Sequence, residues 1–397
     1  MQLSDRVLSI KESPTLAITA KAVKLKSEGK DVIALAAGEP DFNTPVHIKE
    51  YAKKAIDAGQ TKYTAVGGTP ALKQAIIDKF KRENNVSYTA NEILVSVGGK
   101  HSFFNLCMAY INPGDEAIIP APFWVSYPDI VTLAGGVPVI VSCGIEQNYK
   151  LTAAQLEAAI TPKTRLLVIN SPSNPSGAVY TLDELKALAA VLKKHPQVLV
   201  ASDDMYEHIL LGDTKFCNIL DADPSLKEQV MLFNGVSKAY SMTGWRIGYV
   251  GGPAPLVKAM EKIQSQSTTS PAAMSQAAAV EALNGDQSCI APMTEAFNRR
   301  HNMVLERLNK MRGIKCLPAG GSFYAYPDCR EAIQNLFDEG KITETTDLAF
   351  GDYLLEKALV AIVPGSAFGT EGYFRLSFAT SDEILKEAMD RIEKALA

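Results

Sequence analysis

The sequence predicts an α/β protein in which a large domain, with a mostly parallel sheet sandwiched by helices, is joined to a smaller α+β domain. Two patterns favour this class. Short apolar runs alternate with longer stretches of helical periodicity, as in repeated strand–helix units. The runs are also almost continuously hydrophobic, which is typical of parallel strands covered on both faces. With 397 residues, the chain is long enough for two such domains.

Six apolar runs are predicted to be strands of the large sheet. They cover residues 93–97, 117–119, 166–169, 198–201, 230–233 and 248–250. Helices are expected between them. Thr44 and Pro45 would open one helix as N-cap and first-turn proline. Thr181 would cap another helix over residues 182–192.

The C-terminal part of the chain has a different pattern. A long helical stretch over residues 291–311 is followed by short strands near 361–363 and 374–378, and by a final helix to Ala397. We therefore predict a large domain over residues 46–290. The small domain is predicted to combine residues 1–45 with residues 291–397.

Composition argues against several classes of protein. The formal net charge is −4 and no basic block appears, which disfavours a nucleic-acid binder. No apolar run approaches the ~20 residues that a membrane span needs, and the charged N-terminus does not resemble a signal peptide. The six cysteines are scattered without a CxxC pair, so neither a metal site nor a disulfide framework is expected. A cytoplasmic protein is the simplest interpretation.

Glycine, amide, carboxylate, phenol and amine groups follow four of the predicted strands. They lie in the segments GGKH at 98–101, NSPSNPSG at 170–177, SDDMY at 202–206 and NGVSK at 234–238. Taken singly, each segment is more simply a turn, a helix cap or a solvated charge. Ligands of open α/β sheets bind beyond the carboxyl ends of the strands, so the four segments together favour one shared site.

The segment at 98–101 is not a nucleotide-binding P-loop, because Leu94 and His101 stand where that motif needs Gly and Ser or Thr. No GxGxxG motif follows a strand either. A cation such as Lys100 is unfavourable in the first turn of a helix, whereas bare glycine amides at a helix start bind anions. Lys100 is therefore explained if an anion binds close by; the alternative is a side chain turned into water.

Lys238 follows a buried strand and lies among small residues. Burial disfavours the charged amine and lowers its pKa, and a neutral amine condenses with carbonyl groups. Gly235 and Gly244 leave room for a flat cofactor, and the guanidinium of Arg246 suits a phosphate. A cofactor with an aldehyde and a phosphate arm, pyridoxal 5′-phosphate, fits both features.

Such a cofactor stores electrons only if its ring nitrogen stays protonated, which a buried carboxylate ensures. Asp203 is the candidate carboxylate. Tyr206 and Asn174 could hydrogen-bond the ring oxygen. Trp124, in the segment PFWVSYP at 122–128, could cover the face of the ring.

These motifs resemble the aspartate aminotransferase family of pyridoxal-phosphate enzymes, in its prokaryotic-type branch. The segment GVSKAYSMTGWRIG at 235–248 matches the lysine-attachment signature of the family. The resemblance extends over essentially the whole chain, from SPTLAIT at 13–19 and AGEPDF at 37–42 to GYFRLSFA at 372–379.

The resemblance implies a role for each candidate around the cofactor ring. Lys238 would bind the cofactor as a Schiff base and later move the proton as general base. Asp203 would pair with the pyridine nitrogen. Tyr206 and Asn174 would bind the ring oxygen, and Trp124 would stack on the ring.

The resemblance also implies that two subunits hold the cofactor phosphate. In one subunit the groups would be the amides of Gly99 and Lys100, with Ser237 and Arg246. Tyr63, in TKYTAVGG, would reach the phosphate of the neighbouring subunit. A homodimer with shared active sites is therefore implied.

The substrate is expected to be a small amino acid or 2-oxo acid, used in a ping-pong transfer. By resemblance, Arg375 would clamp its α-carboxylate, with Gly38, Trp124 and Asn174 beside it. A surface ion pair is the alternative for Arg375, although an arginine inside an apolar strand makes it less favoured.

The identity of the amino donor depends on how a distal carboxylate would be bound. One branch of the family uses an arginine of the neighbouring subunit, and the corresponding segment at 263–270, IQSQSTTS, has none. The prokaryotic-type branch uses a lysine and a threonine, which Lys100 and Thr15 match. L-Aspartate and L-glutamate are therefore the expected donors, and 2-oxoglutarate and oxaloacetate the acceptors. Relatives with the same lysine and threonine also act on prephenate, so the resemblance leaves a dual activity open. Alternatives are an alanine, aromatic or kynurenine aminotransferase, or a lyase or decarboxylase using the same cofactor.

Overall fold

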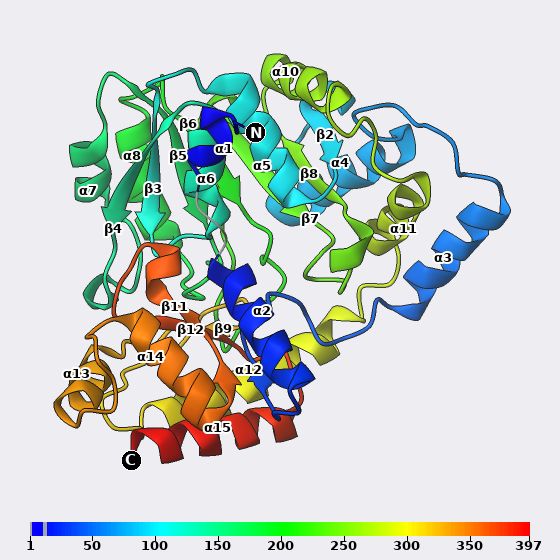
Figure 1. Ribbon diagram of the computed structural model, residues 1–397. Coiled ribbons are helices and arrows are strands. Elements are labelled where there is room, and N and C mark those ends of the chain that lie inside the picture. Colours follow the sequence, from blue (N-terminus) through cyan, green and yellow to red (C-terminus); the bar gives the residue numbers. More distant parts are fainter. Residues whose placement is uncertain (1, 11–13) are drawn as a thin grey trace.

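The computed structural model describes residues 2–10 and 14–397, without the side chains of residues 14–17 and 19. A large part of the molecule is built on a seven-stranded sheet, and a smaller part lies beneath it (Figure 1). The order of strands in the large sheet is β2-β8-β7-β6-β5-β3-β4. Their bounds are β2 Ile93–Ser96, β3 Glu116–Ala121, β4 Val137–Ser142, β5 Thr164–Asn170, β6 Leu199–Asp203, β7 Val230–Gly235 and β8 Gly248–Gly251.

All six strands predicted for the large sheet are present, and the predicted α/β class is confirmed. Strand β8 is the exception to parallel order, since it runs antiparallel to both β2 and β7. The sequence analysis missed β4, which lies at the edge of the sheet. Pro138 interrupts its apolar run, and prolines within strands are found mainly at such edges.

The strands are hydrophobic throughout because both faces of the sheet are buried. Along β5, Leu167 and Ile169 pack into one core, whereas Leu166 and Val168 pack into the other. One face is covered by α4 (Pro70–Asn84), α7 (Ala153–Ala159), α8 (Leu182–Leu192), α9 (Ile219–Ala222) and α11 (Ala273–Asn284). Helix α3 (Val46–Asp57) packs against α11 and projects away from the sheet (Figure 1). The other is covered by α5 (Gly99–Tyr110), α6 (Ser126–Leu133) and α10 (Ala254–Ser265).

Two predicted helix starts have different outcomes. Thr181 caps α8 as expected, since its side chain accepts a hydrogen bond from the Glu184 amide in a capping box. The expected start at Thr44 and Pro45 is displaced by one residue, because Pro45 is itself the N-cap and α3 begins at Val46. The Thr44 hydroxyl instead accepts a hydrogen bond from the Trp245 indole and donates one to the Ser241 carbonyl.

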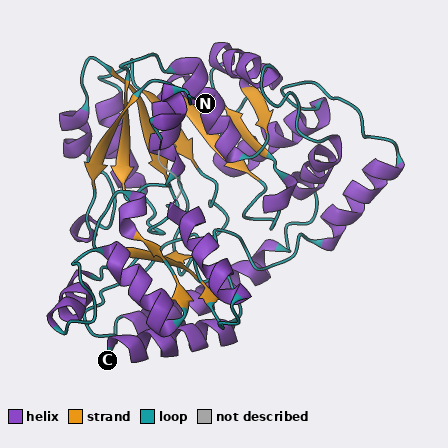
Figure 2. Cartoon of the chain, viewed as in Figure 1, coloured by secondary structure: helices purple, strands orange, loops and turns teal. Residues whose placement is uncertain are grey.

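The smaller part has its own core and its own short strands (Figure 2). An antiparallel sheet has the order β11-β12-β9, and β1 pairs in parallel with β10. The strands are β1 Ile33–Ala34, β9 Tyr324–Ala325, β10 Val360–Ala361, β11 Val363–Pro364 and β12 Phe374–Ser377. The helices are α2 Pro14–Ser27, α12 Ile290–Leu308, α13 Arg330–Asp338, α14 Asp347–Tyr353 and α15 Asp382–Leu396; α1 Asp5–Leu8 precedes them.

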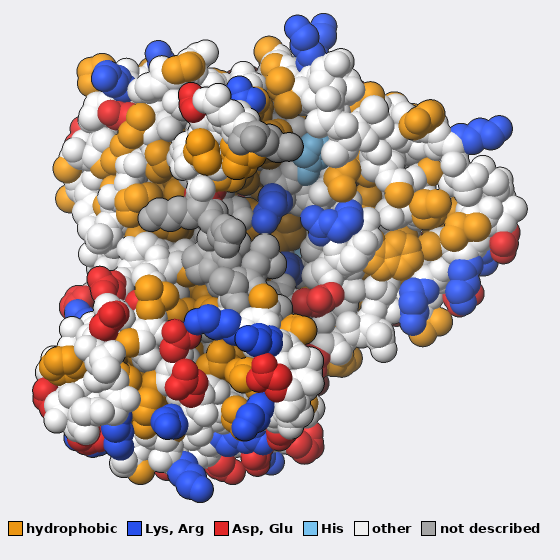
Figure 3. Space-filling view, in the orientation of Figure 1, with side chains coloured by type: hydrophobic (Ala, Val, Ile, Leu, Met, Phe, Trp, Pro, Cys, Tyr) orange, Lys and Arg blue, Asp and Glu red, His pale blue; other side chains and the backbone are white. Residues whose placement is uncertain are grey.

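Leu35, next to β1, packs in one core with Phe297 and Phe374. The N-terminal segment thus contributes to the smaller part, while the boundaries at residues 45/46 and 290/291 stay predictions. We find no helix among the described ones with the length and hydrophobicity needed to cross a bilayer. Acidic and basic side chains are interspersed over the smaller part on the face drawn in Figure 3.

Candidate active site

The ends of three strands meet around one methionine side chain. The methyl group of Met205, just past β6, would lie 2.7 Å from a Cβ placed on Gly99 and 3.1 Å from one placed on Gly235. Gly99 follows β2 and opens α5, and Gly235 ends β7. The glycines therefore allow the three strand ends to approach closely, so three of the four segments predicted to share a site converge here.

Lys238 lies three residues beyond β7, with its amine directed at the N-terminal segment. Its Nζ donates a hydrogen bond of 2.6 Å to the Gly38 carbonyl. The same atom lies 5.8 Å from the ring centroids of Tyr206 and of Phe323. Burial, with a further contribution from Arg375, lowers the pKa of Lys238 to about 8. The neutral, nucleophilic form is thus accessible near neutral pH.

Asp203 is the last residue of β6, and its side chain is partly buried. It accepts hydrogen bonds from the Tyr127 hydroxyl at 2.5 Å and from the Met205 amide at 3.2 Å. Burial raises the pKa of Asp203 above its ordinary value despite these two donors. Such a carboxylate gains from a further cationic N–H partner, which is the role expected for it.

Arg375 lies on β12 and is 4% exposed, so the alternative of a surface ion pair does not apply. Its Nη1 donates to the Asn174 side-chain oxygen at 2.8 Å, and its Nη2 donates to the Ala36 carbonyl at 2.7 Å. Its Nε is a buried donor without a hydrogen-bond partner among the described residues. Since a buried unpaired donor is costly, this guanidinium is suited to bind a carboxylate that enters the site.

Two tyrosines that the sequence analysis did not select complete this side of the site. The Tyr324 hydroxyl lies 3.1 Å from that of Tyr206, and its ring centroid is 4.4 Å from the Arg375 guanidinium. A Cβ on Gly38 would approach the Tyr324 hydroxyl to 2.9 Å, so only glycine fits there. Tyr127, the donor to Asp203, is the other. Their motifs, GGSFY and PFWVSYP, were visible in the sequence, but their contacts were not.

The predicted phosphate cradle forms where α5 begins. Gly98 has a φ of +85°, and the Arg246 guanidinium packs directly on it. Arg246 also donates to the Thr243 carbonyl at 2.8 Å. The first amides of α5, from Gly99 onward, are available to an anion, as at other helix N-termini. Ser237 is 6% exposed in the adjacent loop.

The remaining predicted residues have different surroundings. The Lys100 amine lies 5.1 Å from the centroid of the Trp124 ring, and burial together with Arg246 lowers its pKa. Tyr63 is 94% exposed and points away from the core of its own chain. The side chain of Thr15 lies outside the described residues.

These residues fit pyridoxal 5′-phosphate. Lys238 supplies an amine of lowered pKa, and Asp203 supplies a partly buried carboxylate. The Gly98–Gly99 turn and Arg246 together form a cradle for an anion. Any side chain at position 98 would collide with the Arg246 guanidinium and so disturb this cradle. The donor set therefore matches an aldehyde, a ring nitrogen and a phosphate.

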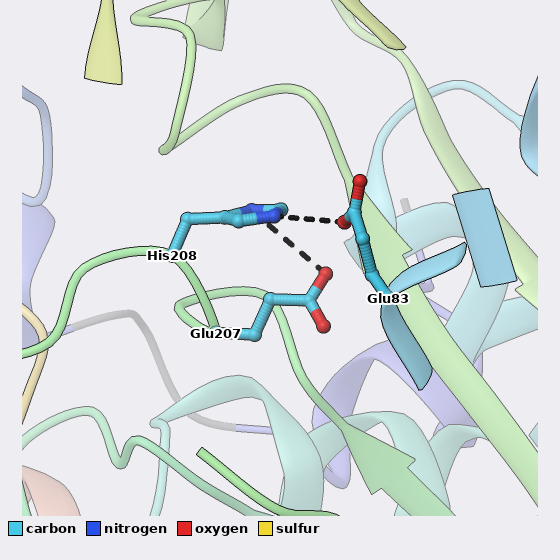
Figure 4. A group of neighbouring side chains, drawn as sticks. All are labelled: Glu83, Glu207 and His208. Atoms are coloured by element: carbon cyan, nitrogen blue, oxygen red, sulfur yellow. Dashed lines mark hydrogen bonds and ion pairs between the residues drawn. The ribbon is translucent and has the colours of Figure 1, made fainter. Parts of the chain in front are cut away.

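A second polar cluster is drawn in Figure 4 and consists of Glu83, Glu207 and His208. Glu207 and His208 directly follow Tyr206 in the sequence. His208 hydrogen-bonds Glu83 at 2.9 Å. Lys79, which is fully buried, forms an ion pair with Glu207 and lies 3.5 Å from Glu83. The single ammonium group already pairs with both carboxylates that a metal ion would need, and His208 bonds to one of them. We therefore interpret the cluster as a structural ion-pair network.

Comparison with known proteins identifies close similarity over the full chain. The family described as aminotransferase class I and II matches residues 30–392. The aspartate/prephenate aminotransferase of Nitrosomonas europaea is 61% identical, with 100% of both chains covered. That of Cereibacter sphaeroides is 53% identical and covers 98% of each chain.

Solved structures agree with the sequence comparisons. The aspartate aminotransferase of Rhizobium meliloti superimposes with a TM-score of 0.95 at 49% identity, covering 100% of this chain and 99% of that one. The Thermus thermophilus aspartate aminotransferase, solved with maleate, has a TM-score of 0.92 at 41% identity over 100% of both chains.

Proposed function

The chain belongs to the class I and II aminotransferase family, and from this premise we propose its reaction. It transfers the amino group of L-aspartate or L-glutamate to 2-oxoglutarate or oxaloacetate, and prephenate is a further acceptor. Relatives that are 61% and 53% identical over nearly their full length are aspartate/prephenate aminotransferases. The observation that carries the proposal is the buried Arg375, whose Nε needs a partner, beside the amine of Lys238.

We propose that pyridoxal 5′-phosphate is held by Lys238, Asp203, the Gly98–Gly99 turn and Arg246. When bound, it supplies an electron sink that stabilises negative charge at the substrate α-carbon. The protein's part is to orient the substrate and to move one proton. Arg375 binds the α-carboxylate, and Lys238 Nζ takes the α-proton as general base. An amine with a pKa of about 8 suits this task because it exchanges protons readily near neutral pH.

Asp203 keeps its role because Tyr127 remains a donor. Burial and the Asp203 charge raise the pKa of Tyr127 well above its ordinary value, so the phenol stays protonated and holds the carboxylate in place. Tyr206 likewise stays protonated, since burial raises its pKa. It can therefore donate a hydrogen bond to an anionic ring oxygen, together with the Asn174 amide.

We further propose a cytoplasmic homodimer in which Tyr63 completes the phosphate site of the partner. The 94% exposure of Tyr63 supports this role, because a phenol so exposed has nothing to bind in its own chain's core. Tyr51 and Ile56 of α3 are also exposed, at 41% and 48%. Exposed apolar side chains of this kind are what a dimer contact would cover.

Selectivity for dicarboxylates is proposed to depend on Lys100 and Thr15. The Lys100 amine lies over the Trp124 ring, at the edge of the site. The Lys100→Met variant should raise the KM for L-aspartate about 10- to 100-fold, since a charge-assisted contact contributes roughly 1.5–3 kcal/mol. The KM for L-alanine should not rise.

The test is the absorbance of the purified holoenzyme, before and after L-aspartate is added without an oxo acid. Bleaching of the band of the Lys238-bound cofactor would show the first half of the transfer. If aspartate leaves the band unchanged but alanine, an aromatic amino acid or kynurenine bleaches it, the donor assignment is wrong. Absence of the band in the presence of added cofactor would overturn the proposed function itself.

A further inference from the structure

Two buried glutamines hold the segment that carries Tyr63. Gln264 belongs to α10 and Gln276 to α11, and both side chains are 0% exposed. A buried amide is costly unless its donors and acceptor are paired. The hydrogen-bond partners of these two side chains therefore identify the backbone segments that each glutamine holds in place.

Gln264 links two segments that are far apart in sequence. Its Nε2 donates to the Val66 carbonyl at 2.7 Å and to the Val95 carbonyl at 2.8 Å. Its Oε1 accepts from the Ser96 hydroxyl at 2.8 Å and from the Asn105 amide at 2.9 Å. Every hydrogen-bonding position of the amide is thus used.

The partners of Gln264 lead to two different phosphate sites. Val95 and Ser96 end β2, immediately before the Gly98–Gly99 turn of the same subunit. Val66 is three residues from Tyr63, which is proposed to serve the partner's site. Exposed as it is, Tyr63 depends for its position on the backbone anchors of its own segment.

Gln276 anchors the Tyr63 segment, and the hydrogen bonds found for its side chain in the described part of the chain do not include β2. Its Oε1 accepts from the Thr69 amide at 2.8 Å, and its Nε2 donates to the Thr64 hydroxyl and the Pro271 carbonyl, each at 2.9 Å. It is therefore a natural comparison for Gln264, since the two differ in whether they also support the strand that precedes the cradle.

We propose that Gln264 is a positioning residue that supports both the phosphate cradle of its own subunit and the Tyr63 segment donated to the partner's site. This rests on the proposed homodimeric pyridoxal-phosphate enzyme. One side-chain amide then positions the cradle of one phosphate site and the Tyr63 segment of the other. Displacing it loosens both sites at once, although it contacts neither phosphate.

The test uses mixed dimers in which a Lys238→Ala subunit leaves one reactive site. In the first dimer, a Gln264→Met subunit retains Lys238 and its partner carries Lys238→Ala, so the altered cradle is tested. In the second, a wild-type subunit pairs with a Gln264→Met, Lys238→Ala subunit, so only the donated Tyr63 segment is altered. The readout is the cofactor dissociation constant, from the absorbance of the Lys238-bound form.

We expect Gln264→Met to raise this dissociation constant about ten-fold in both dimers, as the loss of one or two hydrogen bonds implies. Gln276→Met should raise it only in the second arrangement. Gln229→Met is the matched control: its Nε2 donates to the carbonyls of Leu192, His195 and Val198, away from the cradle. It should change neither dimer.

An effect of Gln264→Met in the first dimer alone would overturn the inference while leaving the proposed function intact. A wild-type protein that forms no Lys238-bound cofactor, or no dimer, would overturn both. If Gln264→Met does not fold, Gln264→Glu serves in the same dimers. It keeps the acceptor oxygen and the length of the side chain but loses the donor to Val66 and Val95.

Discussion

Three charged residues, Lys238, Arg375 and Asp203, lie within electrostatic reach of one another in the candidate site. Burial and the charge of Arg375 lower the pKa of Lys238, while Asp203 acts in the opposite direction. Arg375 is itself positioned by Asn174 and Ala36 rather than by a carboxylate. The folded chain therefore concentrates positive charge where an anionic substrate and cofactor are proposed to bind. Without these anions, the repulsion between the positive charges lowers the free energy of unfolding of the apo-protein.

The cost at Lys238 can be measured through pH. Its pKa is about 8 in the fold against 10.5 ordinarily, so between these values the unfolded apo-protein binds more protons and stability rises with pH. Relative to Lys238→Met, wild-type apo-protein should be less stable at pH 7 by on the order of 3 kcal/mol. This deficit should shrink towards pH 10.5. Urea unfolding of both proteins across that range checks it; a difference independent of pH would contradict it.

At the scale of elements, the site is made by strand ends and the helix that follows β2. Strands β2, β6 and β7 are parallel to one another, so the segments after them lie at one edge of the sheet. The antiparallel β8 returns from the Lys238 loop and brings Arg246 against Gly98. The reversal of this one strand thus places the lysine and the phosphate cradle together.

Gly98 offers a matched pair of variants. Gly98 and Gly114 both have a φ of +85°, but a Cβ would overlap Arg246 only at Gly98 and would meet nothing within 4 Å at Gly114. Gly114→Ala should cost roughly 1 kcal/mol of stability through backbone strain. Gly98→Ala should cost more, roughly 1–3 kcal/mol, because Gly98 with a ψ of 161° lies in a region that essentially only glycine adopts. Only Gly98→Ala should weaken cofactor binding, by about ten-fold or more, as the cradle loses its shape. Thermal unfolding and cofactor titration measure the two effects, and equal cofactor affinities would refute the explanation.

At the scale of the whole molecule, the candidate site joins the two parts of the chain. Arg375 comes from the smaller sheet, and its partner Asn174 follows β5 of the large sheet. Amides of Gly320 and Gly321 also donate to the Gly177 carbonyl, at 2.9 and 3.1 Å. Binding of a substrate carboxylate to Arg375 would therefore act on the relative position of the parts.

We expect the holoenzyme to become more compact when a dicarboxylate analogue such as maleate binds. Arg375 would draw the smaller part towards the ligand, as in hinge closure of other two-part enzymes. Small-angle X-ray scattering should show a lower radius of gyration with the analogue. Arg375→Lys, which lacks the planar fork, should respond less, and an unchanged radius for the unaltered holoenzyme would rule out closure.

The sequence by itself determined the fold class and singled out the candidate reactive residues. Continuous apolar runs predict buried parallel strands, and the segments after them contain Lys238, Asp203 and Asn174. These signals are local, because hydrophobic periodicity and turn composition are properties of short segments. The family resemblance added roles for Arg375 and Tyr63 that no local pattern could supply.

Only the tertiary structure decided which groups hold the reactive ones in place. Tyr127 reaches Asp203 across 76 positions of sequence, and Gln264 reaches Val66 across 198. The antiparallel direction of β8 and the edge position of β4 were equally invisible beforehand. The physical reason is that a buried polar group must find its partner wherever packing places one, and packing depends on residues distant along the chain.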